Sequence, residues 1–305
     1  MGQLKNQLDE KNNVVLLTGD TGMLGQSIKK VFTNCGYTVY GISRSSPDYS
    51  INLENSQEVM TCIEDLKPDI IINTAAMVDI SRCERDPGEA YLINAKLPGT
   101  IAQKSKEINS YFIQISTDHF FIGDIGKKHT EDDEVTLCNE YAQTKYLGEC
   151  LSLLYSNSLV VRTNVVGFRN RGVDTFVEWI IHSIKGNEPL TLFDDFYTSS
   201  ITSVDFARIL IDLINIRPTG VINIASSEVT NKEVFVCSLV KSIFGFNPVY
   251  DRGSVHSNGL TSRADSLGLD VTKAEKLLGY SMPGLKETIK SLTNEYHARM
   301  QEYEV

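Results

Sequence analysis

The chain has 305 residues, of which 41% are hydrophobic and 22% charged, as in an ordinary globular protein with a large core. The net charge of −10 argues against a general nucleic-acid binder, and no apolar run approaches the roughly eighteen residues of a membrane span. Residues 1–13 lack the apolar stretch of a signal peptide and are expected to form a disordered tail, so we expect a cytoplasmic protein. The six cysteines include no CxxC pair, which favours reduced thiols and no metal site.

A glycine-rich turn near the N-terminus follows a buried strand and opens a helix. Residues 14–17 are continuously apolar, and Gly19, Gly22 and Gly25 follow at spacings of three. Leu24, Ile28, Val31 and Phe32 then recur at helical spacing. Strand, turn and helix in this order are typical of a dinucleotide site, in which the N–H groups of the helix N-terminus meet a pyrophosphate.

The next strand, 38–42, ends in Ser43-Arg44-Ser45-Ser46, about twenty residues after the glycines, where an acidic residue would bind the ribose 2′-hydroxyl of NAD. A cation and hydroxyl donors suit the 2′-phosphate of NADP instead. We therefore expect NADPH as the cofactor, with NADH as the alternative if Arg44 is only a solvated surface residue.

Strands and helices alternate through the first half of the chain. A helix is expected at 55–66, capped by Asn55, and a mostly helical stretch at 87–108, with Tyr91, Ile93, Leu97 and Ile101 facing inward. Further strands are expected at 69–73, 111–115, 159–163 and 220–225, and further helices at 141–154, 175–184, 204–214 and 232–244. The alternation predicts an α/β fold, a Rossmann doubly wound parallel sheet of about seven strands.

Two segments carry the residues that point to a reaction. Tyr141 and Lys145 lie four apart on one helix face, where an ammonium would lower the pKa of the phenol toward the working range of an acid. Thr117 follows the strand 111–115 and would offer a second donor to a developing alkoxide. A surface i,i+4 pair is the alternative for Tyr141 and Lys145 taken alone.

These stretches resemble an extended short-chain dehydrogenase/reductase of the dTDP-4-dehydrorhamnose reductase-like group. The matching segments are Gly19-Asp-Thr-Gly22-Met-Leu-Gly25, Asn73-Thr-Ala-Ala, Glu84-Arg-Asp-Pro87, Asn94-Ala, Ile115-Ser-Thr-Asp118, Thr130-Glu-Asp-Asp133, Asn139-Glu-Tyr141-Ala-Gln-Thr-Lys145 and Gly148-Glu149. The resemblance spans nearly the whole chain and is denser before residue 165 than after it.

The resemblance implies a sugar-nucleotide 4-ketoreductase that serves surface-polysaccharide or glycan sugar biosynthesis. It implies Thr117, Tyr141 and Lys145 as catalytic residues, and Asn94 as the residue that positions Lys145 through water. The residues expected to bind the cofactor are Gly19, Thr21, Gly22, Met23, Leu24, Gly25, Ser43, Arg44, Asn52, Leu53, Thr74, Ala75, Ala76, Asn94, Tyr141 and Lys145. Those expected to bind a nucleotide sugar are Asp118, His119, Val166 and Arg263.

The chain departs from the group around the expected substrate mouth. His119 stands where the group usually has Tyr, either as an extra donor or acid or as a packing substitute, and Ser200-Ile201 replaces Pro-Thr. Arg162, Arg169 and Arg252 join Arg263 as candidates for the nucleotide diphosphate, with Arg263 preferred. The departures bear on the identity of the sugar.

The second half is expected to form a smaller α+β lobe that binds the substrate. We expect the Rossmann domain at 14–165, completed by 201–226, and the lobe at 166–200 and 227–305. Residues 286–305 read as an exposed charged helix, either a homodimer contact or a plain terminal helix.

Three other functions are compatible with the same scaffold. A 4,6-dehydratase would carry an acid where His119 stands, and a 4-epimerase would retain NAD, which Arg44 disfavours. A non-catalytic, NADP-binding regulatory subunit like that of methionine adenosyltransferase could keep Thr117, Tyr141 and Lys145.

Overall fold

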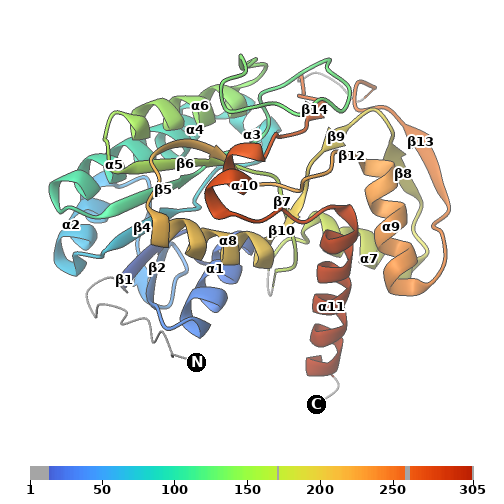
Figure 1. Cartoon of the computed structure of the whole chain (residues 1–305), viewed down its shortest axis with the longest axis horizontal. Coiled ribbons are helices and arrows are strands. Elements are labelled where there is room, and N and C mark those ends of the chain that lie inside the picture. Colours follow the sequence, from blue (N-terminus) through green and yellow to red (C-terminus); the bar gives the residue numbers. More distant parts are fainter. Residues whose placement is uncertain (1–13, 170–171, 258–261, 304–305) are drawn as a thin grey trace.

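The computed structural model describes residues 14–169, 172–257 and 262–303, so the expected tail at 1–13 lies outside the described residues. Seven strands form one parallel sheet in the order β11-β6-β5-β4-β1-β2-β3 (Figure 1). Their bounds are β1 Val14–Thr18, β2 Thr38–Ser43, β3 Tyr49–Ser50, β4 Ile70–Asn73, β5 Tyr111–Ile115, β6 Ser158–Arg162 and β11 Gly220–Asn223. The order reverses between β1 and β4, the switch point at which doubly wound sheets bind ligands. The predicted Rossmann sheet is confirmed, and its edge strand β3 was missed because two residues carry no periodic pattern.

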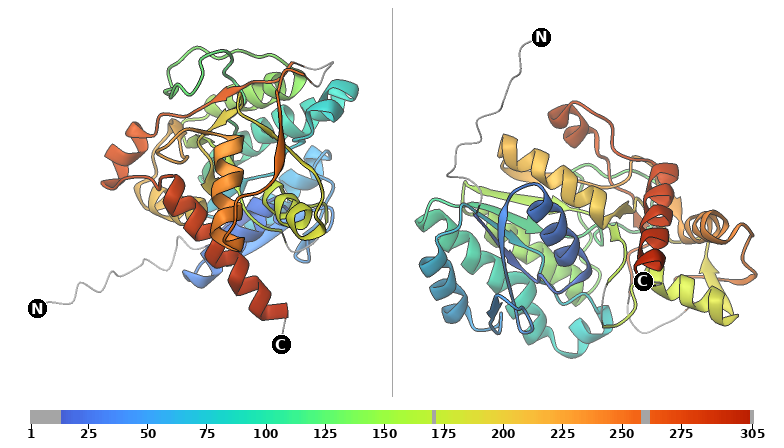
Figure 2. Two further views of the ribbon diagram at one scale, coloured as in Figure 1. Left: turned by 90° about the vertical axis from the view of Figure 1, so that its right-hand side faces the viewer. Right: turned by 90° about the horizontal axis from the view of Figure 1, so that it is seen from below.

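The helices around the sheet cover both of its faces, as alternating side chains require. Val15 and Leu17 face a core with α1 (Met23–Asn34) and α8 (Ser203–Ile216). Leu16 faces the opposite core, which contains residues of α2 (Ser56–Leu66) and α5 (Leu97–Glu107). The two views of Figure 2 show the sheet between these two helical layers.

The expected helix 87–108 is broken into three parts. They are α4 Pro87–Tyr91, the π-helical turn η1 Leu92–Lys96 and α5, preceded by the short helix α3 Ile80–Arg85. Leu97 and Ile101 are buried as predicted, but Tyr91 is 42% exposed, so its inward placement was wrong. The π-turn adds a residue to the helical repeat, so the 3.6-residue period used for the prediction does not hold across it.

The remaining elements form the second part of the molecule. Its helices are α7 Phe176–Gly186, α9 Lys232–Phe244 and α11 Leu285–Tyr303, whereas α10 Thr272–Leu278 packs against β11 and the core of the large sheet. Its strands are β7 Val165–Val166, β8 Leu190–Phe193, β9 Tyr197–Thr198, β10 Ile201–Thr202, β12 Thr230–Asn231, β13 Tyr250–Gly253 and β14 Ser266–Leu267. They pair as three small sheets, and this mixture is compatible with the expected α+β lobe, whose boundaries stay a prediction.

The C-terminal helix α11 extends beyond the rest of the chain (Figure 1) but is not a fully exposed helix. Ile289, Leu292 and Tyr296 are buried with α7 and α9 residues in the core of the second part. The expectation of an exposed helix was therefore wrong for this face. Its apolar residues are separated in the sequence by many charged ones, which hide the buried stripe.

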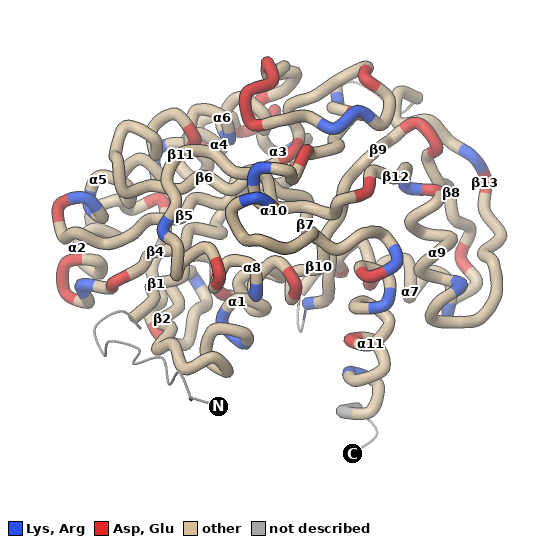
Figure 3. Tube along the Cα trace, in the orientation of Figure 1, with Lys and Arg blue, Asp and Glu red and all other residues tan. Residues whose placement is uncertain are grey.

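Among the described residues, no helix is long and apolar enough to cross a bilayer. Basic and acidic residues are distributed over both parts of the molecule (Figure 3).

Helix α6 (Glu140–Leu153) lies against η1 with no room for a side chain at Gly148. A Cβ there would lie 2.1 Å from the carbonyl oxygen of Asn94, which belongs to backbone and cannot rotate away. Close contact between α6 and η1 therefore fixes the height of Tyr141 and Lys145 above the sheet.

We predict that Gly148→Ala lowers the free energy of unfolding by about 1–3 kcal/mol, because the methyl group overpacks two backbones. Gly88→Ala is the matched control, since a Cβ at this helical glycine meets nothing within 4 Å, and it should be neutral or stabilise by up to about 1 kcal/mol. Urea unfolding of both variants measures the difference. Equal stability of the two would contradict the packing argument.

Candidate active site

Two neighbouring cavities lie where the strands of the sheet end. The first, of about 380 Å³, is lined by the loop after β2 and is called here the Arg44 cavity. The second, of about 490 Å³, is lined by the end of β5 and the start of α6 and is called the Tyr141 cavity. Both are lined by Gly19, Gly22, Thr74, Ala76 and Arg169. The two cavities therefore meet over the glycine turn and together reach from Arg44 to Tyr141.

Nearly all of the residues expected at the cofactor line these cavities. The Arg44 cavity contains Gly19, Thr21, Gly22, Ser43, Arg44, Asn52, Leu53, Thr74, Ala75 and Ala76. The Tyr141 cavity contains Gly19, Gly22, Met23, Leu24, Gly25, Thr74, Ala76, Tyr141 and Lys145. Asn94 is the exception and lines neither of them.

The glycine turn has the shape that an anion site requires. Gly19 has a φ of +72°, which glycine adopts without strain. A Cβ at Gly25 would lie 2.2 Å from the Gly19 carbonyl oxygen, so the start of α1 packs directly on the turn. Gly22 is the N-cap of α1 and provides no side chain to bind the first N–H groups. These donors at the helix N-terminus suit a pyrophosphate, and the cavity walls on either side leave space for its two nucleosides.

Tyr141 and Thr117 meet in the Tyr141 cavity. Tyr141 is 7% exposed and Thr117 4% exposed, and a hydrogen bond joins their side chains. Burial raises the pKa of the Tyr141 phenol, and the negative charge of Asp118 adds to the rise, while the Thr117 hydrogen bond opposes it. The phenol is therefore held as the protonated acid, next to a second hydroxyl.

Lys145 lies below this pair and is directed at the sheet. Its Nζ donates to the Ile115 carbonyl oxygen at 2.8 Å. Burial lowers the pKa of Lys145 to about 8, and the charge of Glu149 partly offsets this effect. The expected lowering of the Tyr141 pKa by Lys145 is not seen in this structure, because desolvation dominates the phenol and the ammonium is bonded to a carbonyl instead.

The carbonyl that holds Lys145 is the end of a buried chain of hydrogen bonds across three strands. Thr18 on β1 donates to Asn73 on β4, and Asn73 donates to Gln114 on β5 at 2.7 Å. Gln114 in turn donates to the Ile115 carbonyl oxygen at 2.8 Å. We call Thr18, Asn73 and Gln114 the polar ladder. Each of its members is at most 1% exposed.

Asn94 supports the part of α6 that carries Lys145. Its Oδ1 accepts from the Met77 N–H at 2.9 Å, and its Nδ2 donates to the Met77 carbonyl at 3.0 Å and to Thr144 at 3.2 Å. Its side chain thus ties the segment after β4 to the neighbour of Lys145 in α6. The structure places Asn94 as a support of α6 and not in the cavity wall.

The start of α6 is fixed by two further acceptors. The Asn139 side chain accepts from the Ala142 N–H at 2.8 Å, as an N-cap does. Glu84 Oε1 accepts from the Glu140 N–H at 2.9 Å. These bonds hold the first turn of α6, which carries Tyr141, against α3.

His119 and Asp118 line the Tyr141 cavity, as expected of substrate residues. Burial, together with the charges of Lys232 and Arg263, lowers the pKa of His119 to about 4. Its ring lies edge-on to Tyr141 at 5.6 Å between centroids. A neutral imidazole that packs on the phenol agrees with the packing interpretation and disfavours the acid.

Asp118 is 1% exposed and accepts from Asn164 Nδ2 at 2.7 Å. Burial raises its pKa to about 7. Burial therefore favours the protonated, neutral form of this carboxyl group. Tyr141, Lys145, His119 and Asp118 are all shifted toward their neutral forms by the same cause, the removal of water.

The other predicted substrate residues are placed differently. Val166 lines the Tyr141 cavity, whereas Arg263 is exposed and acts on the site through its charge on His119. Arg162 is a structural residue, because its guanidinium is 4% exposed and paired with Glu149 at 2.8 Å. Glu149 also accepts from Ser116. Arg252, another candidate for the diphosphate, pairs with Glu233 at 3.1 Å.

Two residues at the site, Phe176 and Lys232, were not identified in the sequence. Arg169, a candidate for the nucleotide diphosphate, lines both cavities, and its ligand stays a prediction. Phe176, at the start of α7, lines the Tyr141 cavity. Lys232 Nζ lies 4.4 Å from the centre of the Phe176 ring, and its pKa is lowered to about 8 by burial despite the charge of Asp118. Phe176 and Lys232 reach the site through tertiary contacts between distant segments, so no local sequence pattern marks them as site residues.

A family model described as "RmlD substrate binding domain" matches residues 13–298. The probable low-salt glycan biosynthesis reductase Agl14 of Haloferax volcanii is 25% identical over 291 residues, 90% of this chain and 96% of that protein. The dTDP-4-dehydrorhamnose reductase of Escherichia coli strain K12 is 30% identical over 182 residues, 59% of this chain and 60% of the enzyme.

The fold is shared with solved structures. One is the dTDP-4-dehydrorhamnose reductase of Bacillus anthracis, a complex with NADP, with a TM-score of 0.84 and 22% identity. The superposition covers 93% of this chain and 99% of that one. The similarity confirms the Rossmann architecture derived above.

The raised pKa of Asp118 predicts a pH dependence of stability. The folded state binds the carboxyl proton more tightly than the unfolded state, so the free energy of unfolding falls as pH rises from about 4 to about 7. Asp118→Asn removes this loss. The free energy of unfolding of the variant minus that of wild type should therefore increase by as much as about 4 kcal/mol between pH 4 and pH 7. This figure corresponds to about three pKa units at about 1.4 kcal/mol each.

Urea unfolding of both proteins at pH 4.5 and pH 8 measures the gain. Asp132→Asn, at an exposed carboxylate, is the control and should show no such change. A constant difference between Asp118→Asn and wild type across this range would contradict the proposed burial of charge.

Proposed function

Since the chain belongs to the family described as the RmlD substrate binding domain, we propose that it reduces the 4-keto group of a nucleotide-activated 6-deoxy-4-keto sugar with NADPH. As a reductase it is an oxidoreductase, like the enzymes that its relatives' names describe, and its cofactor is NADP, the nucleotide in the B. anthracis structure. The proposal rests on one observation above all. Tyr141, Thr117 and Lys145 converge in a cavity that continues over the glycine turn to Arg44.

The cofactor would lie across both cavities. We assign its pyrophosphate to the N-terminus of α1 and to Arg169, which lines the junction of the cavities, and its adenosine to the Arg44 cavity. Arg44, with Ser43 and Ser45, would bind the 2′-phosphate. The Tyr141 cavity would hold the nicotinamide, and Lys145 would bind the adjoining ribose.

The chain's own residues handle the proton and the position of the carbonyl. NADPH supplies the hydride to the carbonyl carbon when bound. Tyr141 donates its phenolic proton to the carbonyl oxygen, and Thr117 donates a hydrogen bond to the same oxygen as negative charge develops on it. The phenolate left on Tyr141 takes up a proton from solvent, so the products are an alcohol and NADP⁺.

The influence of Lys145 on Tyr141 would depend on the bound cofactor. Its pKa of about 8 leaves it largely charged at neutral pH. A ribose hydroxyl next to Nζ would bring its charge toward Tyr141, and the Ile115 carbonyl keeps Nζ at a fixed height. We therefore expect the lysine to influence the phenol mainly when the cofactor is bound.

The sugar nucleotide would enter beside His119. Arg263 and Lys232 both bring positive charge to this mouth of the cavity, which suits a diphosphate. The names of relatives from H. volcanii and E. coli refer to glycan biosynthesis and to a dTDP-sugar. We propose that the product is a sugar nucleotide for a surface polysaccharide or glycan.

A substrate panel tests this function directly. The purified chain is assayed for NADPH oxidation with dTDP-4-keto-6-deoxyglucose and with its GDP and UDP counterparts, and the corresponding dTDP-, GDP- and UDP-hexoses without the keto group are the controls. We expect turnover with one keto sugar and none with the controls. Tight NADP binding without turnover of any of them would refute the reductase and favour a regulatory subunit.

Tyr141→Phe should lower kcat by about 100-fold or more, because the proton donor to the carbonyl oxygen is lost. The dissociation constant of NADPH should stay near that of wild type, since the ring is kept. Tyr146→Phe is the control on the same helix, because Tyr146 packs against Phe120. Normal turnover by Tyr141→Phe would exclude the phenol as the acid.

A further inference from the structure

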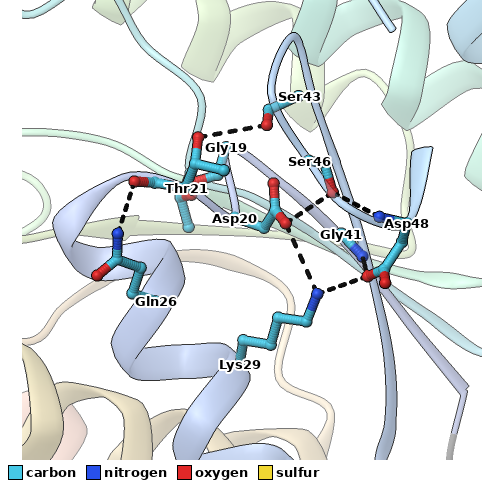
Figure 4. A network of polar contacts seen from close by, with 10 residues as sticks. Gly19, Asp20, Thr21, Gln26, Lys29, Gly41, Ser43, Ser46 and Asp48 are labelled. Atoms are coloured by element: carbon cyan, nitrogen blue, oxygen red, sulfur yellow. Dashed lines mark hydrogen bonds and ion pairs between the residues drawn. The ribbon is translucent and has the colours of Figure 1, made fainter. Parts of the chain in front are cut away.

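A polar cluster lies beside the glycine turn, and none of its side chains lines the Arg44 cavity. It consists of Asp20, Lys29, Ser46 and Asp48, packed around Gly41, and we call it the Asp20 cluster (Figure 4). The proposed reaction uses none of these four side chains, and the sequence patterns gave a role only to Ser46, as one of the hydroxyl donors after β2.

Asp20 is the buried member of the cluster. It is 4% exposed, and its Oδ2 accepts from the Ser46 hydroxyl at 2.8 Å and lies 3.7 Å from Lys29 Nζ. Its Oδ1 is buried without a hydrogen-bond partner. A Cβ at Gly41 would lie 2.0 Å from Oδ2, so only glycine leaves space for this carboxylate. A buried carboxylate is costly unless it is paired, so its few partners are under strong constraint to stay in place.

Asp48 closes the cluster from the loop side. Its Oδ2 accepts from Lys29 Nζ at 2.5 Å and from the Gly41 N–H at 2.7 Å. The Ser46 hydroxyl accepts from the Asp48 N–H at 3.3 Å while it donates to Asp20. Ser46 therefore shapes the loop and also ties it to the glycine turn, and Lys29 bridges the two carboxylates from α1 (Figure 4).

The two segments that the cluster joins are the two walls of the Arg44 cavity. Gly19, Thr21 and Gly22 on one wall flank Asp20, and Ser43, Arg44 and Ser45 on the other wall precede Ser46 directly. On the cavity side, the Thr21 and Ser43 hydroxyls are 3.3 Å apart. The glycine turn and the loop after β2 are thus joined by the Asp20 cluster, and the same two segments carry the residues expected to bind the cofactor.

We propose that the Asp20 cluster is a positioning device for cofactor selection: it holds the wall that carries Arg44 at the distance from the glycine turn at which a 2′-phosphate is bound. The inference rests on the proposed NADP-dependent function and extends it to residues that do not touch the cofactor. Arg44 is itself exposed, and a long flexible side chain on an untethered loop would lose its preference for one geometry.

A positioning role predicts a selective loss of NADP⁺ binding, which a general structural role does not predict. Ser46→Ala removes the hydroxyl that joins Asp20 to the loop, and Lys29→Met removes the bridge between the carboxylates. Each should weaken NADP⁺ binding about ten-fold, the scale of one lost hydrogen bond, and leave NAD⁺ binding nearly unchanged. Lys30→Met is the matched control, because Lys30 is the exposed neighbour of Lys29 on α1.

A double-mutant cycle on the full chain tests the proposal by calorimetric binding of NADP⁺ and NAD⁺. The proteins are wild type, Ser46→Ala, Arg44→Ala and the double variant, with Lys29→Met as a second variant of the cluster. We expect Ser46→Ala to lower the NADP⁺ preference in the presence of Arg44 and to change it little in Arg44→Ala, since the cluster acts through that arginine.

The possible outcomes distinguish a failure of the positioning role from a failure of the proposed NADP-dependent function. If Arg44→Ala lowers the preference while Ser46→Ala and Lys29→Met leave it unchanged, the cluster is not a positioning device and the function stands. Equal losses for NADP⁺ and NAD⁺ would show a general structural role and overturn the inference. If Arg44→Ala leaves the preference intact, the 2′-phosphate is bound elsewhere, and both the assignment of Arg44 and the inference fail.

Discussion

The buried polar ladder of Thr18, Asn73 and Gln114 is the constraint on which the site depends. It joins β1, β4 and β5 at the point where each strand ends, and its last acceptor, the Ile115 carbonyl, also holds Lys145. Unpaired amides in a dry sheet would be costly, so the ladder is satisfied only in one register of the three strands. That register brings the glycine turn, the Thr74 segment and Thr117 to one edge. The cleft is a consequence of how the sheet satisfies its own polar groups.

Removal of water then sets the chemistry of the site. The pKa values of Tyr141 and Asp118 are raised and those of Lys145 and His119 lowered, each with burial as the largest cause. Burial therefore keeps the Tyr141 phenol protonated and shifts each of these neighbouring groups toward its neutral form. Charge that develops on a carbonyl oxygen in such a site interacts strongly with the few donors aimed at it. The fixed partners Thr117 and Tyr141 are suited to this situation, whereas a mobile, charged histidine would not be.

Much of this site could be predicted from the sequence because its signals are local. The glycine spacing, the Ser43-Arg44 position and the pair Tyr141 and Lys145 each lie within one turn or one helix, and the structure brings all of them to one cleft. The exceptions depend on distance. Asn94 supports α6 through Met77 and Thr144, and Lys145 bonds to a strand 30 residues away. Arg169, Phe176 and Lys232 reach the site from segments whose arrangement no local period describes.

The glycine turn has two roles, which explains why Asp20 lies where a small residue would be easier to accommodate. On its cavity side the turn presents Gly19 and Gly22 to the cleft, and on its other side Asp20 binds the loop that bears Arg44. Gly41 is the residue that makes this arrangement possible, because any side chain there would displace the carboxylate. The Asp20 cluster thus joins the turn to the loop, and the polar ladder joins the strand ends that lead to the Tyr141 cavity. On the proposed function, cofactor choice and proton transfer would therefore depend on separate sets of polar contacts.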